Sequence, residues 1–191
     1  MEKIPECSFT KKLAYNIHVT NPEMTIVHMA SHLSYFELAL LIHEFCGTYS
    51  ISNNPEIGFI NDIPPLTSIS KLKSFIKQYS STTSNIRNIR NLKDILNFAS
   101  NDSASPMESR LFIKLSGPRS KGLYGCKNLK LNKKIQLTNS ASRISGQRTI
   151  KPDISNIKEK VAIEYDSSQF HENSEQGQKD KRRRDALVKD G

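Results

Sequence analysis

The chain has 191 residues, of which 36% are hydrophobic, and it carries a formal net charge of +9. This length allows one large domain or two small ones. Its three cysteines match neither a disulfide framework nor a paired zinc motif. The longest purely apolar run, residues 38–42, is far shorter than the roughly 20 residues that a membrane-spanning helix needs. We therefore expect a cytoplasmic protein without a membrane segment.

Short strand-like and helix-like segments alternate along residues 1–100. Apolar residues recur at helical spacing before Gly47, which is a typical residue for ending a helix. The expected elements are strands at 15–20 and 48–52 and helices at 24–30, 34–46, 68–79 and 85–99. Together these elements predict a small, helix-rich α+β domain over residues 1–100.

A polar break at residues 100–105 is the expected boundary with a second domain, over residues 103–191. Ser105, Pro106 and Glu108 have the order of an N-cap, a first helical residue and a capping-box acid. The elements expected after this helix are strands at 129–138, 148–153 and 160–166 and a charged helix at 172–189. Gly191 follows that helix as a C-cap would, so we expect the domain to continue past the end of this sequence.

The positive charge is concentrated in the second half of the chain. Residues 1–100 hold nine Lys and Arg against eight Asp and Glu, whereas residues 101–191 hold nineteen against eleven. Residues 109–151 contain eleven Lys and Arg residues and no Asp or Glu. A stretch with charges of one sign attracts polyanions, which favours a nucleic acid as partner, although a solvated basic face kept for solubility is the alternative. The basic residues expected to contact nucleic acid are Arg110, Arg119, Lys121, Lys133, Lys134, Arg148 and Lys151.

Three acidic residues lie near one another towards the end of the chain. Side chains alternate along a strand, so Glu164 and Asp166 share one face of the strand at 160–166. A loop over residues 154–159 has the length that returns the chain antiparallel, which would bring Asp153 close to Glu164. Crowded carboxylates repel unless a cation lies between them, and hard oxygen ligands favour Mg2+ or Mn2+.

Each of these residues also has a purely structural interpretation. An Asp after a proline is a common turn pair, which accounts for Asp153. Glu164 and Asp166 fit the solvated face of an edge strand, and Glu108 fits a capping box. His171 is placed in the sequence to carry a proton or contact a phosphate, but a single histidine is more often structural.

The second half resembles the PD-(D/E)xK nuclease superfamily, in the branch related to very-short-patch-repair (Vsr) endonucleases. The matching segments are SPMESRLF, GLYG, LNKKI, KPDI, VAIEYDSSQFH and DKRRRDAL, within residues 103–191. The resemblance implies a restriction-endonuclease-like mixed sheet flanked by helices, hydrolysis of phosphodiester bonds in DNA, and Mg2+ or Mn2+ as cofactor. It also implies that Asp153 is the central metal ligand, that Glu164 is the acid of the second motif, and that Glu108 reaches the metal from a helix.

Four further residues take roles from the same resemblance. Asp166 stands where the superfamily commonly has a lysine, and His171 is expected to take over part of the role of that lysine, so both are counted as catalytic candidates. Asp180 and Arg184 match a pattern of this branch on the last helix and are expected to support the site. Their i,i+4 spacing is explained equally well by a helical ion pair.

The first half resembles the C-terminal region of abortive-infection antitoxins of bacterial type IV toxin systems. The similar segment is residues 18–50, HVTNPEMTIVHMASHLSYFELALLIHEFCGTYS. It identifies no chemical site. This resemblance implies a bacterial origin and a defence or mobile-element context.

Two functions of different classes follow from these patterns. The first is a metal-dependent DNA endonuclease, and the second is a non-catalytic, antitoxin-like DNA-binding regulator that retains a nuclease fold. A nuclease acting on RNA is a third, weaker alternative. DNA is the expected partner, and formation of a homodimer is left open.

Overall fold

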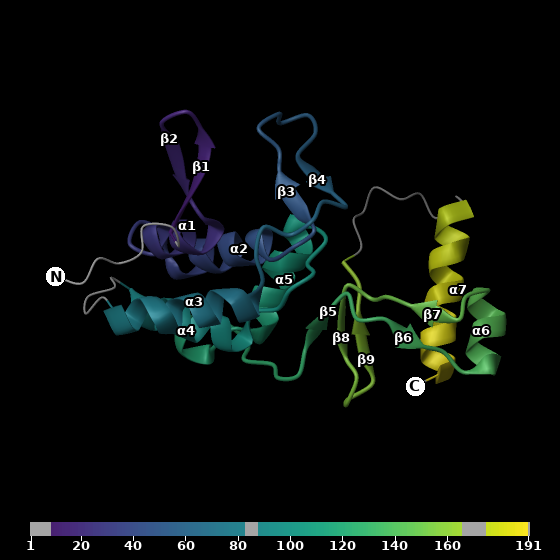
Figure 1. Cartoon of the computed structure of the whole chain (residues 1–191). Helices are drawn as coiled ribbons and strands as arrows, with labels where there is room; N and C mark the ends of the chain where they lie inside the picture. Colours follow the sequence, from purple (N-terminus) through teal and green to yellow (C-terminus); the bar gives the residue numbers. More distant parts are fainter. Residues whose placement is uncertain (1–8, 83–87, 166–174, 191) are drawn as a thin grey trace. The chain divides into compact units, whose positions relative to one another are not determined.

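The computed structural model describes residues 9–82, 88–165 and 175–190 (Figure 1). It divides into two compact units, Met1–Gly125 and Cys126–Gly191, which we call unit 1 and unit 2. The sequence placed the boundary at the polar break near residue 101, whereas the units divide after Gly125. The reason is that helix α5 (Pro106–Ser116), which follows the polar break, packs against helix α2 (Tyr35–Phe45) of unit 1.

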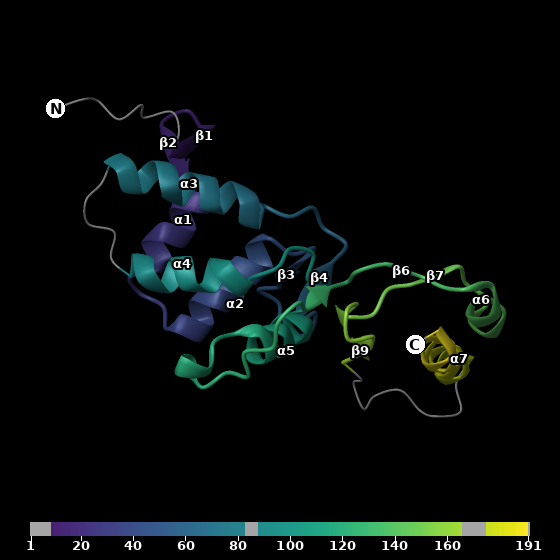
Figure 2. The same cartoon turned by 90° about the horizontal axis from the view of Figure 1, so that it is seen from below.

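Unit 1 combines helices with two antiparallel β-hairpins. Helices α1 and α3 pack together, and α2 contacts both α4 and α5 (Figure 2). The hairpins project from these helices in Figure 1. The remaining helices of unit 1 are α1 (Pro22–Met29), α3 (Ile69–Thr82) and α4 (Ile89–Phe98). The hairpins are β1 (Thr10–Ala14) with β2 (Ile17–Thr20), and β3 (Tyr49–Ile51) with β4 (Phe59–Asn61).

Helices α1, α2 and α5 of unit 1 begin at residues whose side chains cap them, Asn21, Ser34 and Ser105. In α2, Ser34 Oγ accepts a hydrogen bond from the Glu37 N–H, and Glu37 Oε2 accepts one from the Ser34 N–H. This reciprocal arrangement satisfies two backbone donors that a helix otherwise leaves without partners. The apolar faces meet in one core, whose fully buried members include Ile26, Leu38, Ile42, Leu72, Leu92 and Ile95. The helices expected in this half from their periodicity are therefore confirmed.

His43 is the most deeply buried ionisable group described in unit 1. Its side chain is fully inaccessible to solvent and lies against the ring of Phe112. The Nδ1–H donates to the Ala39 carbonyl at 2.8 Å, and the Ser100 N–H donates to Nε2 at 3.4 Å. These contacts require the neutral ring. Burial lowers the pKa of His43 to about 4, although the Ala39 carbonyl partly opposes the shift.

The start of α5 offers a test of how far one cap stabilises unit 1. Ser105 Oγ accepts a hydrogen bond from the Glu108 N–H at 3.2 Å. Ser105→Ala is expected to lower the free energy of unfolding by about 1 kcal/mol, because this N–H then loses its partner. Urea unfolding followed by circular dichroism measures the change, with the exposed Ser120→Ala as control. Equal stability of the two variants would contradict the assignment of the cap.

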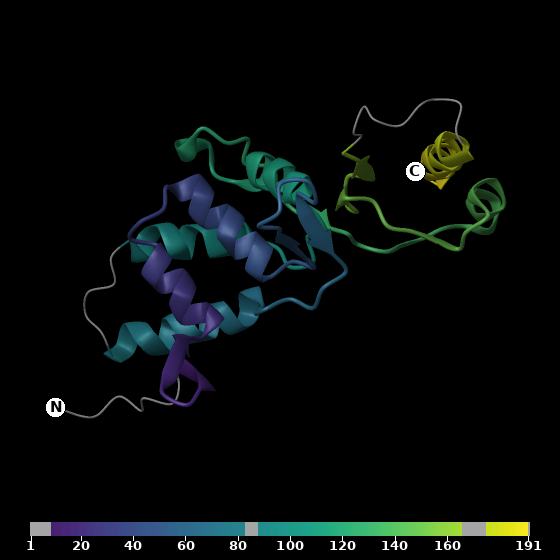
Figure 3. The ribbon, with the colours of Figure 1, turned by 90° about the horizontal axis from the view of Figure 1, so that it is seen from above.

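Unit 2 contains short antiparallel strands and two helices that lie side by side (Figure 3). Strands β5, β8 and β9 form a three-stranded sheet in that order, and β6 pairs with β7. Leu137, Ala141, Ile150 and Ala186 form a small buried cluster. The elements are β5 (Lys130–Leu131), β6 (Ile135–Gln136), α6 (Asn139–Ser145), β7 (Thr149–Ile150), β8 (Ile154–Asn156), β9 (Val161–Ile163) and α7 (Glu175–Asp190).

Three local features of unit 2 differ from the sequence-based expectation. The single strand expected at 129–138 is divided into β5 and β6, with Asn132 between them in a left-handed conformation (φ 50°). Helix α6 was not expected, although Thr138 caps its start and Gly146 its end. The segment expected to be a loop after Asp153 contains β8, which occupies the centre of the sheet.

The α+β class expected for the chain is confirmed, since helices and small antiparallel sheets occur in both units. The described strands that pair do so in antiparallel fashion, so the mixed sheet of a restriction-endonuclease-like fold stays a prediction. Within the described ranges, no helix combines the length and apolar character that crossing a bilayer requires.

Candidate functional site

The pairing of β8 with β9 brings two of the predicted acidic residues together. Ile154 lies opposite Ile163 at one end of this antiparallel pair, so the next residues outward are Asp153 and Glu164. Both of their side chains line one cleft of unit 2. The predicted proximity of Asp153 and Glu164 is therefore confirmed, although residues 154–156 of the expected loop form strand β8 and only a short turn joins it to β9.

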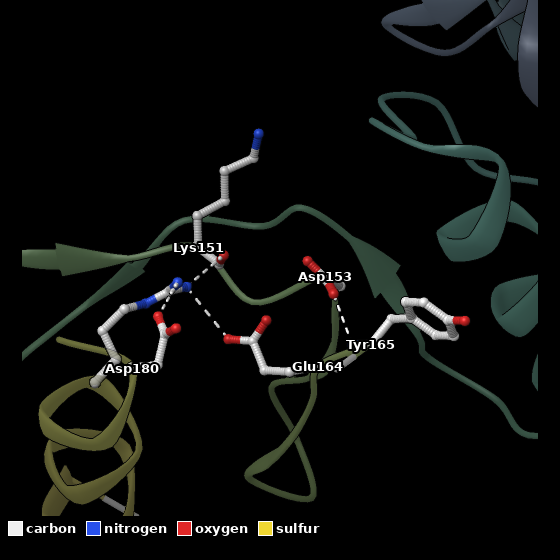
Figure 4. Close-up of polar contacts among 6 residues, drawn as sticks. Lys151, Asp153, Glu164, Tyr165 and Asp180 are labelled. Carbon is white, nitrogen blue, oxygen red and sulfur yellow. Dashed lines mark hydrogen bonds and ion pairs between the residues drawn. The ribbon is translucent and has the colours of Figure 1, made fainter. Parts of the chain in front are cut away.

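Main-chain groups hold Asp153 on both sides. Its carboxylate Oδ2 accepts a hydrogen bond from the Tyr165 N–H at 2.7 Å (Figure 4). Its own carbonyl accepts one from the Asn132 N–H at 2.9 Å, which ties it to the segment after β5. Asp153 is thus positioned by backbone on either side of the central strand, and its carboxylate cannot turn away without losing the bond to residue 165.

Glu164 lies across from Asp153 with about a third of its side chain exposed (34%). Burial raises the pKa of the Glu164 carboxyl, and the negative charge of Asp153 raises it further. The positive charge of Arg183 and a hydrogen bond from the Asp153 backbone act in the opposite direction. The two carboxylates therefore repel one another enough to favour a positive charge beside them.

Arg183 of helix α7 supplies such a charge. Its Nη2 donates to Glu164 Oε1 at 3.2 Å and to the Lys151 carbonyl at 3.2 Å. Its Nη1 lies 4.0 Å from Asp180 Oδ1, one helical turn earlier. Figure 4 shows the carboxylates of Glu164 and Asp180 facing the same space beside Lys151. Arg183 thereby connects α7 to the strand ends that carry the acidic pair.

The cleft around these residues has a volume of about 1050 Å³. Such a volume lies just above the usual range for small-molecule sites. The polar residues that line it include Asp153, Glu164, Asp180, Arg183 and Arg184. The apolar residues that line it include Ile135, Ile157, Val161, Leu187 and Val188. The cleft is therefore a mixed surface, with the acidic pair and the arginines grouped among apolar side chains.

The chemistry of the donors fits a hard divalent cation. Within residues 9–82, 88–165 and 175–190, no three His, Cys, Asp or Glu side chains form a group that could hold a metal ion. Asp153 and Glu164 would provide two carboxylates as ligands of such an ion. Mg2+ is commonly bound by one or two protein carboxylates, with water and substrate phosphate completing the coordination.

The other predicted catalytic residues have different positions. Glu108 belongs to unit 1, where it is buried and its Oε2 accepts a hydrogen bond from the Ala104 N–H at 3.0 Å. The Glu108 N–H is capped by Ser105, and its carboxylate binds the residue before that cap, so one half of the expected capping box is confirmed. Its role as a metal ligand stays a prediction. Asp166 and His171 lie outside the described residues, and their roles also stay predictions.

The seven basic residues expected to contact nucleic acid are all exposed, but they are divided between the two units. Two of those in unit 1 have internal contacts. Arg119 Nε donates to the Tyr124 carbonyl at 3.2 Å, and Lys121 Nζ lies 5.0 Å from the centre of the Tyr35 ring. Unit 2 contributes the other four, Lys133, Lys134, Arg148 and Lys151.

Sequence analysis missed Arg183. It selected Asp180 and Arg184, which line the cleft, yet the residue that contacts Glu164 is the neighbour of Arg184. The run of basic residues before Asp185 gives no periodic signal that would single out one arginine. The acidic residue Glu164 at the end of a strand indicated that a positively charged partner lies nearby, but this signal does not say which residue that partner is.

No family model matches the chain, and no curated protein or solved structure matches it either.

Proposed function

We propose that the chain is a metal-dependent endonuclease that hydrolyses phosphodiester bonds in DNA, with its site in the cleft of unit 2. The observation that carries the proposal is the placement of Asp153 and Glu164 side by side at the ends of paired strands. A restriction-endonuclease-like fold and a bacterial defence context belong to the same proposal, through the resemblance of the sequence motifs.

In this proposal the carboxylates of Asp153 and Glu164 hold Mg2+ or Mn2+ in the cleft. The bound ion would polarise a phosphoryl oxygen and acidify a water molecule for attack on phosphorus. Asp153 needs little reorganisation, because the Tyr165 N–H already fixes its carboxylate. The raised pKa of Glu164 is consistent with a site that a cation stabilises.

The exposed basic residues of unit 2 support a polyanion as substrate. Lys133, Lys134, Arg148 and Lys151 are close in sequence to the strands that form the site, and each side chain is solvent-exposed. Lysines and arginines that neutralise phosphates give affinity through release of counterions, so binding should weaken as salt increases.

A nicking assay on supercoiled plasmid DNA tests the proposal. We expect conversion to open-circular and linear forms with Mg2+ or Mn2+, and none with EDTA. The same assay on single-stranded RNA tests the alternative substrate. Salt-sensitive DNA binding without cleavage under any of these conditions would contradict the proposal and favour the non-catalytic regulator.

A further inference from the structure

Arg183 is already bound to the carboxylate that the proposed metal needs. Its Nη2 lies 3.2 Å from Glu164 Oε1, and a divalent ion bound to the same carboxylate would lie close to this guanidinium and be repelled by its positive charge. The side chains of Arg183 and Glu164 are 32% and 34% exposed, so the pair is only partly screened by water. Glu164 therefore already has a positive partner supplied by the chain itself.

The second contact of Arg183 makes this arrangement specific. Its Nη2 also donates to the Lys151 carbonyl, a main-chain group two residues before Asp153. The planar guanidinium can hold a carbonyl and a carboxylate together, which a lysine ammonium on a flexible stem does less well. Asp180, on the same helix, lies 4.0 Å from the other terminal nitrogen, Nη1, as a second acidic partner.

We propose that Arg183 is the resident cation of the Glu164 carboxylate, and that a divalent ion gains Glu164 as a ligand only when Arg183 withdraws towards Asp180. Metal binding is then coupled to a change in how α7 is attached to the strand ends. This inference rests on the proposed function for the identity of the metal site. It goes further by making Arg183 a residue that limits metal affinity.

Arg182 provides the matched control. It lies on the same helix and carries the same charge, but its side chain is exposed and does not line the cleft. General loss of positive charge from α7 should thus affect Arg182→Gln and Arg183→Gln alike. Loss of direct competition should affect Arg183→Gln alone.

The test is Mn2+ binding to the full-length chain without DNA, followed by the electron paramagnetic resonance signal of free Mn2+. We expect Arg183→Gln to bind Mn2+ about fivefold more tightly than the wild type, as loss of one partly exposed competing ion pair implies. Arg182→Gln should stay within about twofold of the wild type. Arg183→Lys, which keeps the charge but loses the double contact, should fall between the wild type and Arg183→Gln.

Equal or weaker Mn2+ binding by Arg183→Gln, relative to Arg182→Gln, would overturn the inference, as would absence of Mn2+ binding in every variant. Circular dichroism checks that each variant is folded. If Arg183→Gln does not fold, the comparison of Arg183→Lys with the wild type still decides the question. Plasmid nicking with an unchanged Mn2+ affinity in Arg183→Gln would overturn this inference alone. Tighter Mn2+ binding without nicking in any variant would overturn the proposed function alone.

Discussion

Asp153→Asn is expected to lower Mg2+-dependent plasmid cleavage by at least about 100-fold. Loss of residues that merely orient metal ligands typically costs 10- to 100-fold in activity or affinity, so loss of a ligand charge should cost at least as much. The asparagine oxygen can still accept the hydrogen bond from the Tyr165 N–H, so the local fold at the end of β9 is preserved. Initial rates of nicking at saturating Mg2+ measure the effect.

Two comparisons separate a metal ligand from a general charge effect. Asp185→Asn removes one negative charge from an exposed position of α7 that does not line the cleft, and it should cleave within about twofold of the wild type. DNA affinity of Asp153→Asn, measured by fluorescence anisotropy in EDTA, should also stay within about twofold. Cleavage by Asp153→Asn at the wild-type rate would exclude Asp153 as a ligand of the catalytic metal.

Lowering the pH from 7 to 4 is expected to destabilise unit 1 by about 3 kcal/mol through His43 alone. Its pKa is near 6.5 in the unfolded chain and about 4 in the fold, so between these values the unfolded state binds the additional proton. The contribution of neutral His43 to the free energy of unfolding is therefore fully present above pH 6.5, and it is lost as the pH falls from 6.5 to 4. The physical cause is that the imidazolium would be buried, with a second N–H directed at the Ser100 N–H.

Urea unfolding between pH 4 and pH 7, followed by circular dichroism, measures this dependence. His43→Gln should have a flatter profile over this range, at the cost of lower stability at pH 7, because its amide does not ionise. His32→Gln, at an exposed position of the same unit, should keep the wild-type profile. A profile of His43→Gln as steep as that of the wild type would show that other groups cause the acid destabilisation.

The helices of unit 1 could be predicted because their signals are local. Ser34 and Ser105 precede their helices by one residue, and apolar side chains recur at the period of the helix behind each of them. Both helices and the Ser105 cap occur in the structure as the sequence indicated, whereas Ser34, expected as the first helical residue, is the cap of α2. Local signals of this kind do not depend on what the helix later packs against.

The elements of unit 2 were harder to predict because they are very short. Helix α6 has the sequence NSASRIS and buries only Ala141, so it lacks an apolar period. Its caps, Thr138 and Gly146, were the signals that could have identified it. Strand β8 is stabilised by neighbours on both sides, which depends on pairing across the sheet rather than on its own residues.

The proximity of Asp153 and Glu164 was predicted correctly, although part of the expected loop is strand β8. An antiparallel return that pairs Ile154 with Ile163 brings the two residues together, whether the residues between them form a loop or two strands and a turn. Arg183 could not be found in this way, because it approaches from α7, beyond the residues that separate the two carboxylates. Side-chain selection among adjacent arginines depends on helix rotation, which the sequence does not specify.

The attachment of Asp153 to backbone groups has a consequence for how this site tolerates sequence change. The N–H of residue 165 and the N–H of residue 132 are present whatever side chains stand there, apart from proline. The exposed Tyr165 ring can therefore be replaced during divergence without releasing the carboxylate. Neighbouring side chains can vary to suit different substrates, because hydrogen bonds from the main chain fix the orientation of Asp153.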